Sequence, residues 1–80
     1  MRYLIKISFK NKLSWVEIQT FKKYFESKFY NTIDGENYIL LTPDDIDYYQ
    51  DNGILYYTGN DIMLVINGLW YNIEIEEVNL

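Results

Sequence analysis

The sequence contains no cysteine and no histidine, and no basic residue follows Lys28. Without cysteine there is no disulfide framework, no thiolate nucleophile and no cysteine-ligated zinc site. Without histidine the chain lacks the most common general base and the most common metal ligand. These absences disfavour most hydrolytic and metal-dependent enzymes. We therefore expect a protein that is not an enzyme, with no catalytic residues, no cofactor and no bound metal.

Long hydrophobic runs are also absent. The longest, such as Ile62–Ile66, are far shorter than the roughly 20 apolar residues that a membrane-spanning helix needs. The first ten residues carry lysines within an apolar alternation and lack the apolar core of a signal peptide. We expect a cytoplasmic protein with no membrane partner.

The composition suits one small domain in which the basic residues lie in the first third of the sequence and most acidic residues lie in the rest. The 80 residues are 49% hydrophobic and 19% aromatic, which supplies a core for a single domain over residues 1–80. Up to Lys28, seven basic and two acidic residues give a net charge of +5, and from Phe29 onward ten acidic residues give −10. Such asymmetry bears on partners and electrostatic steering rather than on fold.

Hydrophobic periodicity predicts the first two elements. Alternation over residues 2–10 predicts a half-buried strand. Ser14 and Glu17 have the spacing of a capping box, and an apolar stripe follows them, which predicts a helix over residues 14–30. The stripe consists of Trp15, Ile18, Phe21, Phe25 and Phe29. Four of its five members are aromatic, so this helix is expected to supply much of the core.

The second half of the chain predicts a short helix and a meander. A loop over residues 31–37 precedes a strand at Tyr38–Leu41, and Thr42-Pro43 begins a helix of about two turns that stops at Gly53. Strands are expected at residues 54–58, 62–66 and 69–77, with Asn67-Gly68 as a hairpin turn. The order β-α-β-short α-β-β-β predicts an α+β domain. It should have a mostly antiparallel sheet of about five strands, with one main helix packed on one face.

The strand Ile62–Ile66 is apolar on both faces, which predicts a central strand covered on both sides. The long helix can cover only one of these faces. One possibility is that the short helix covers part of the other face. The other is that a partner or a second copy covers it, at a surface that includes Leu4, Trp70 and either Met63 or Ile62. The alternative is a sheet that the chain covers internally.

The densest feature of the sequence is an acidic, tyrosine-containing run on the expected short helix. Its members are Asp44, Asp45, Asp47, Tyr48, Tyr49 and Asp51. Such a surface can dock on a basic partner, because carboxylates meet the same arginine and lysine side chains as phosphates do. The alternative is structural: Asp44 and Asp45 suit a helix N-terminus, and one tyrosine belongs to the core. The run does not match an EF-hand calcium loop.

A second acidic group lies on the last strand, at Glu74, Glu76 and Glu77. These residues either flank the same docking surface or form a solvated sheet edge that resists strand addition. If the first and last strands are neighbours, Lys6 faces Glu74 or Glu76. A competing site for nucleic acid would use Lys10, Lys12, Lys22, Lys23 and Lys28. The ten acids in the second half disfavour direct nucleic-acid binding.

The −10 stretch from Phe29 to Leu80 and the run Asp44–Asp51 resemble the small acidic phage-encoded anti-defence proteins, of which anti-CRISPR inhibitors are the best-known group. The resemblance is one of class, and no residue is carried over. If a phage encodes the protein, the expected location is the cytoplasm of the host cell. It implies a non-enzymatic inhibitor that mimics nucleic acid and blocks a basic site on a partner, such as a nuclease or another nucleic-acid-handling complex. The alternatives are a small nucleic-acid-binding regulator and a structural dimer or assembly subunit.

Overall fold

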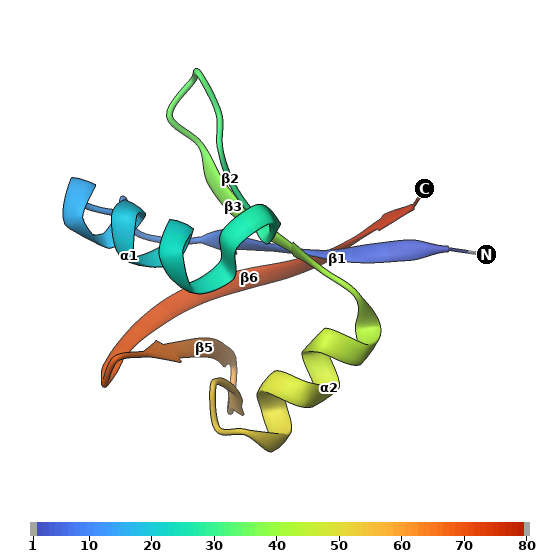
Figure 1. Ribbon diagram of the computed structural model, residues 1–80. Coiled ribbons are helices and arrows are strands. Elements are labelled where there is room, and N and C mark those ends of the chain that lie inside the picture. Colours follow the sequence, from blue (N-terminus) through green and yellow to red (C-terminus); the bar gives the residue numbers. More distant parts are fainter. Residues whose placement is uncertain (1, 80) are drawn as a thin grey trace.

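The computed structural model describes residues 2–79, which form one antiparallel sheet and two helices (Figure 1). The helices are α1 (Trp15–Phe25) and α2 (Pro43–Asp51), and a 3-10 turn, η1 (Glu26–Lys28), follows α1. The strands are β1 (Tyr3–Phe9), β2 (Phe29–Asn31), β3 (Asn37–Leu41), β4 (Leu55–Thr58), β5 (Asp61–Ile66) and β6 (Leu69–Asn79). Their order in the sheet is β2-β3-β1-β6-β5-β4. The α+β prediction is confirmed, with six strands rather than about five.

Both helices begin at the residues that the sequence predicts. The Ser14 hydroxyl accepts the Glu17 N–H, and the Glu17 carboxylate accepts the Ser14 N–H, which completes a capping box. Thr42 begins α2 in the same way. At the β5–β6 turn, Asn67 and Gly68 both have positive φ, of 52° and 78°, as a two-residue hairpin turn requires.

The sixth strand comes from residues that were predicted to be helix and loop. The helix α1 ends at Phe25, because Glu26 takes a φ of 54° and leaves the helical region. Phe29 pairs with Ile39 in the β2–β3 hairpin, and its ring still lies 6.0 Å from that of Phe21. The prediction of a helix to residue 30 is therefore wrong, although Phe29 is a core residue. Phe29 lies four residues after Phe25, about one helical turn, so its position in the sequence is compatible both with a longer α1 and with the strand β2.

The core lies between the sheet and the two helices, which pack on the same face. Phe21 of α1 contacts Phe9 and Tyr71, whereas Ile46 of α2 lies over Ile5 and the neighbouring Ile75. The register places all of these strand residues on one face. The buried side chains are Ile7, Leu13, Phe21, Phe25, Phe29, Ile39, Leu41, Ile46, Leu55, Leu64, Ile66 and Ile73.

Trp15 was predicted to belong to the core stripe of α1 but is 73% exposed. At 3.6 residues per turn, the six-residue step from Trp15 to Phe21 leaves the two side chains about 120° apart around the helix. The stripe is therefore too wide to fit on the sheet. Phe21 and Phe25 occupy its buried centre, and Trp15 falls outside it.

Within the described residues 2–79, the opposite face of the sheet carries no helix, and we call it the open sheet face. The register assigns to it Leu4, Lys6, Ser8, Tyr30, Tyr38, Leu40, Tyr56, Thr58, Asp61, Met63, Val65, Trp70, Asn72, Glu74, Glu76 and Val78. The prediction that Ile62–Ile66 is central and covered twice is wrong, because β5 is second from the edge and α2 lies on the same side as α1. Tyr56 and Trp70, which pair with Met63 and Val65, give these residues partial cover from the neighbouring strands.

Candidate binding surfaces

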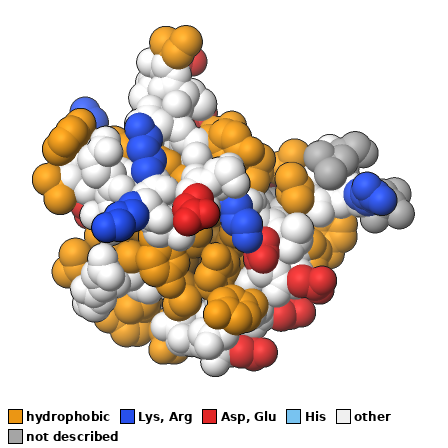
Figure 2. Space-filling view, in the orientation of Figure 1, with side chains coloured by type: hydrophobic (Ala, Val, Ile, Leu, Met, Phe, Trp, Pro, Cys, Tyr) orange, Lys and Arg blue, Asp and Glu red, His pale blue; other side chains and the backbone are white. Residues whose placement is uncertain are grey.

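The helix α2 divides the predicted acidic run into an outer and an inner set. Asp44, Asp47, Tyr48 and Asp51 are exposed and lie three or four residues apart, so they form one stripe on the outside of the helix. We call these four residues the α2 surface. Figure 2 shows the acidic side chains gathered over α2, on the same face of the molecule as the basic side chains over α1.

Asp45 belongs to the inner set and has a structural role. Its Oδ2 accepts the Thr42 N–H at 3.1 Å and contacts the Lys28 Nζ at 3.2 Å. Burial alone would raise the pKa of Asp45, but the hydrogen bonds from Thr42 and Lys28 outweigh it and lower the pKa. The carboxylate is thus already committed to a helix cap and an ion pair.

The two tyrosines of the run have different environments. Tyr49 is half-buried and packs edge-on against Phe25, with ring centroids 5.8 Å apart, whereas Tyr48 is 61% exposed. Burial also raises the pKa of Tyr49. This agrees with the expectation that one tyrosine belongs to the core, and it leaves Tyr48 as the aromatic side chain available for contact.

An open, partly apolar groove of about 350 Å³ lies beside the α2 surface. It runs between α2 and the sheet and is lined by Tyr3, Ile5, Pro43, Ile46, Asp47, Tyr57 and Ile75. Sequence reasoning missed its strand residues as site residues, because in sequence they are ordinary alternating core positions. These strand residues are accessible because α2 is short and leaves the end of the sheet beside it uncovered. Tyr57, for example, is 55% exposed.

The acidic residues of the last strand do not form one group. Glu74 and Glu76 point to the open sheet face, away from α2, whereas Glu77 pairs with Ile5 and lies on the α2 side. The strand β6 lies between β1 and β5, so the prediction of a solvated sheet edge here is wrong. Lys6 pairs with Glu76 in the register, as expected, with 3.9 Å between the Nζ and Oε1 atoms.

Of the five lysines considered for nucleic acid, Lys28 is engaged within the protein, because it is paired with Asp45. Lys6, which was not among the five, is engaged as well: its Nζ lies 3.2 Å from the Glu36 Oε1 and 4.8 Å from the centre of the Tyr38 ring. Lys10 and Lys12 are exposed after β1, and Lys22 and Lys23 are exposed on the last turn of α1. The five candidate lysines therefore do not form one row.

Within residues 2–79, no three or more acidic, histidine or cysteine side chains gather in a way that could hold a metal ion. In the same part of the chain, no helix combines the length and apolar character needed to cross a membrane.

The chain was also compared with known proteins, and no protein-family model, no curated protein and no solved structure matches it.

Proposed function

We propose that this protein is a non-enzymatic binding protein whose α2 surface docks on a basic site of a partner protein and keeps nucleic acid out of that site. The observation that carries the proposal is the position of the α2 surface beside the groove. Asp47 lines a groove that also contains Ile5, Tyr57 and Ile75, and the two other carboxylates of the α2 surface are exposed on the same stripe of the helix. Protein interfaces commonly combine an apolar centre with a polar rim.

Electrostatics supports a basic partner. Within residues 2–79, Asp44, Asp47 and Asp51 form no ion pair, so their charges are directed outward. Glu77 lies on the same side of the sheet and adds to this field. Exposed charges of one sign accelerate association with an oppositely charged surface, and salt weakens the effect. Binding should therefore be fast and salt-sensitive.

The experiment compares two variants with equal charge change. One carries Asp47→Lys and Asp51→Lys, which leave the first turn of α2 intact, and the control carries Asp34→Lys and Asp61→Lys on exposed loop and strand-end positions. Each protein is used to capture partners from the native host lysate, with and without nuclease. The captured partner is then purified and titrated with each variant and with nucleic acid.

The proposal predicts a partner that survives nuclease treatment and that DNA or RNA displaces. The Asp47/Asp51 variant should bind it at least tenfold more weakly, and the control should bind nearly as well as the natural chain. Equal weakening in both variants would show that only net charge matters. Simultaneous binding of nucleic acid and this protein to the partner would contradict the blocking role.

A second candidate function is self-association through the open sheet face. Trp70 and Tyr56 stack there with ring centroids 5.2 Å apart, and Trp70 is 55% exposed. Exposed apolar patches of this kind favour contact with another protein, here a second copy. Sedimentation at high protein concentration tests this candidate, and a monomer at every concentration would exclude it.

A further inference from the structure

The side of α1 that faces away from the sheet carries a second surface, which the proposed function does not use. Trp15, Val16, Gln19, Lys22 and Lys23 are all exposed, and their spacing of three, four and seven residues places them on one stripe of the helix. We call these five residues the α1 surface. Trp15 and Val16 make its start apolar, and within residues 2–79 the two lysines at its end form no ion pair.

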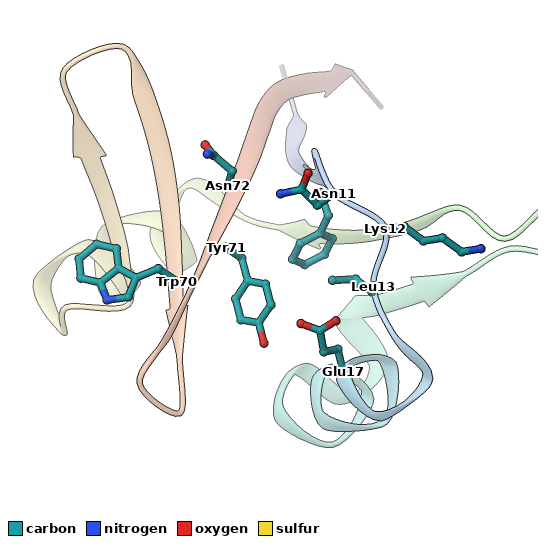
Figure 3. A pocket seen from close by; sticks show the side chains of 8 residues that line it. Asn11, Lys12, Leu13, Glu17, Trp70, Tyr71 and Asn72 are labelled. Carbon is teal, nitrogen blue, oxygen red and sulfur yellow. The ribbon is translucent and has the colours of Figure 1, made fainter.

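The acidic residues near α1 do not cancel the charge of this surface. Figure 3 shows the Glu17 carboxylate pointing toward the Tyr71 hydroxyl of β6, and the same carboxylate accepts the Ser14 N–H at 2.8 Å. Glu17 therefore faces the sheet and not the α1 surface. Glu26, in the turn after α1, offsets one of the two lysines, so the end of the stripe keeps a net positive charge.

The oppositely charged α2 surface lies on the same side of the molecule but does not neutralise the α1 surface. Figure 2 shows basic side chains over α1 beside acidic side chains over α2. The ion pair that joins the two regions is Lys28–Asp45, and neither residue belongs to either surface. Among residues 2–79, Asp44, Asp47 and Asp51 form no ion pair either. Pairing between the two halves of one chain therefore uses neither surface.

Two such surfaces on one side of a molecule are complementary to the same two surfaces of a second copy. The helix sides of two copies can face each other across a two-fold axis that lies in the contact plane and runs between α1 and α2. In that arrangement α1 of each copy lies on α2 of the other, and the assembly closes after two copies. Each contact joins lysines to aspartates and adds the exposed rings of Trp15 and Tyr48, as interfaces with apolar and polar parts commonly do.

The charge pattern favours a second copy over nucleic acid as the occupant of the α1 surface. A nucleic acid would meet two lysines and the net charge of −5 of the chain, which repels phosphates. A second copy offers three exposed aspartates on a stripe of similar length, since at 1.5 Å per residue the two stripes are about 12 and about 10 Å long. The equal net charges of the two copies oppose association, so the dimer should need a high protein concentration.

We propose that the α1 surface binds the α2 surface of a second copy, and that two such reciprocal contacts form a two-fold dimer. The dimer goes beyond the proposed function and does not depend on it. Only its regulatory consequence rests on the proposed function: the dimer covers the α2 surface, so a basic partner has to displace the second copy before it can dock.

The test is sedimentation equilibrium of the full chain and of charge-reversed variants over a series of protein concentrations. The Lys22/Lys23 variant carries Lys22→Glu and Lys23→Glu, and the Asp47/Asp51 variant carries Asp47→Lys and Asp51→Lys. Circular dichroism and thermal unfolding check that each variant is folded. Glutamate in the last turn of α1 opposes the helix dipole, so Lys22→Gln with Lys23→Gln serves as a milder second variant that should weaken the dimer in the same direction.

The control carries Lys10→Glu and Lys12→Glu, which change the net charge as much as the Lys22/Lys23 variant does. Both control positions are exposed in the segment after β1 and lie outside the α1 surface. The control therefore separates the effect of the α1 surface from that of net charge.

We expect the natural chain and the control to dimerise about equally, and the Lys22/Lys23 and Asp47/Asp51 variants each to dimerise at least tenfold more weakly. An equimolar mixture of these two variants should form a heterodimer, because each contact then again joins one acidic and one basic surface. A chain with all four substitutions should dimerise about as well as the natural chain for the same reason.

A natural chain that stays monomeric at every concentration, or a mixture of the two variants that stays monomeric, would overturn the proposal. Equal association of all variants would also overturn it and would assign the contact to the open sheet face. The Lys22/Lys23 variant keeps the α2 surface, so it should capture a basic partner at least as well as the natural chain. Dimerisation without capture of a basic partner would refute the proposed function alone, and capture without dimerisation would refute the dimer alone.

Discussion

The Lys28 Nζ lies 3.2 Å from the Asp45 Oδ2, and this ion pair connects the turn after α1 to the first turn of α2. The same carboxylate accepts the Thr42 N–H and completes the capping box of α2. One side chain therefore fixes the start of the helix that presents the α2 surface, although it does not belong to that surface.

The substitution Asp45→Asn should lower the free energy of unfolding by about 1 kcal/mol at neutral pH, mainly through the weakened cap. Lys28 is partly exposed, so its ion pair with Asp45 adds little to the free energy of unfolding. Urea unfolding measures the change. The control Asp47→Asn, on the exposed side of the same helix, should stay within about 0.5 kcal/mol of the natural chain. Equal effects of the two substitutions would contradict the assigned role of Asp45.

Stability should fall in acid, and part of that fall should be traceable to Asp45. The pKa values of Asp45 and Glu17 are lowered in the folded state, so both carboxylates stabilise it above their unfolded pKa values. This contribution is lost as the pH falls below about 4 toward the folded pKa values. Unfolding of the natural chain and of Asp45→Asn at pH 7 and pH 3 should show a difference that shrinks at pH 3. A difference of constant size would be inconsistent with the lowered pKa.

Replacing Glu26 with glycine should stabilise the protein. Glu26 has φ 54° and ψ −123°, a combination that glycine adopts readily and other residues do not. We expect the free energy of unfolding to rise by about 1 kcal/mol. Glu26→Gln is the matched control, since it removes the charge and keeps the backbone cost. A gain from the glutamine variant equal to that from glycine would attribute the effect to charge instead.

Phe21 and Trp15 should respond very differently to truncation, although both belong to the predicted stripe. Phe21→Ala removes a fully buried ring and should cost about 3–5 kcal/mol, whereas Trp15→Ala should cost about 0.5 kcal/mol or less. Chemical denaturation of the two variants gives both numbers. A large loss for Trp15→Ala would mean that the stripe packs as a whole and that α1 is rotated from its assigned position.

Trp70 should be open to solvent in the isolated chain. In a Trp15→Phe variant it is the sole tryptophan, and with 55% of its surface exposed a neutral quencher such as acrylamide should reach it efficiently. The quenching constant should not change with protein concentration if the chain is monomeric. Protection that grows with concentration would instead support self-association through the open sheet face.

Local signals predicted most of the fold. The caps at Ser14 and Thr42 and the turn at Asn67-Gly68 are short-range features with a direct chemical cause, and all three are present. The strand β2 was missed because Phe29 satisfies the helical period of α1, and the break at Glu26 has no sequence signal such as glycine or proline. Which face α2 covers depends on long-range packing that periodicity does not encode.

The candidate site was predictable only in part. The acidic run was found, but its division into exposed residues and the capping residue Asp45 depends on the helix phase and on Lys28, which lies 17 residues earlier. The groove arises beside α2, where the short helix leaves the end of the sheet uncovered. Such gaps are set by the relative lengths of the elements, so a residue like Tyr57 resembles an ordinary core position in the sequence.

The strand order has a consequence for how the chain folds. The β2–β3 hairpin and the β4–β5–β6 meander join neighbouring segments, and in the sheet β1 connects the two, since it pairs with β3 on one side and with β6 on the other. The ladder between β1 and β6 pairs Tyr3 with Asn79. Closing that ladder brings together segments from opposite ends of the chain, at a cost in loop-closure entropy that local hairpins avoid. The central ladder should therefore form last and limit the folding rate, in the range typical of sheets with distant pairings.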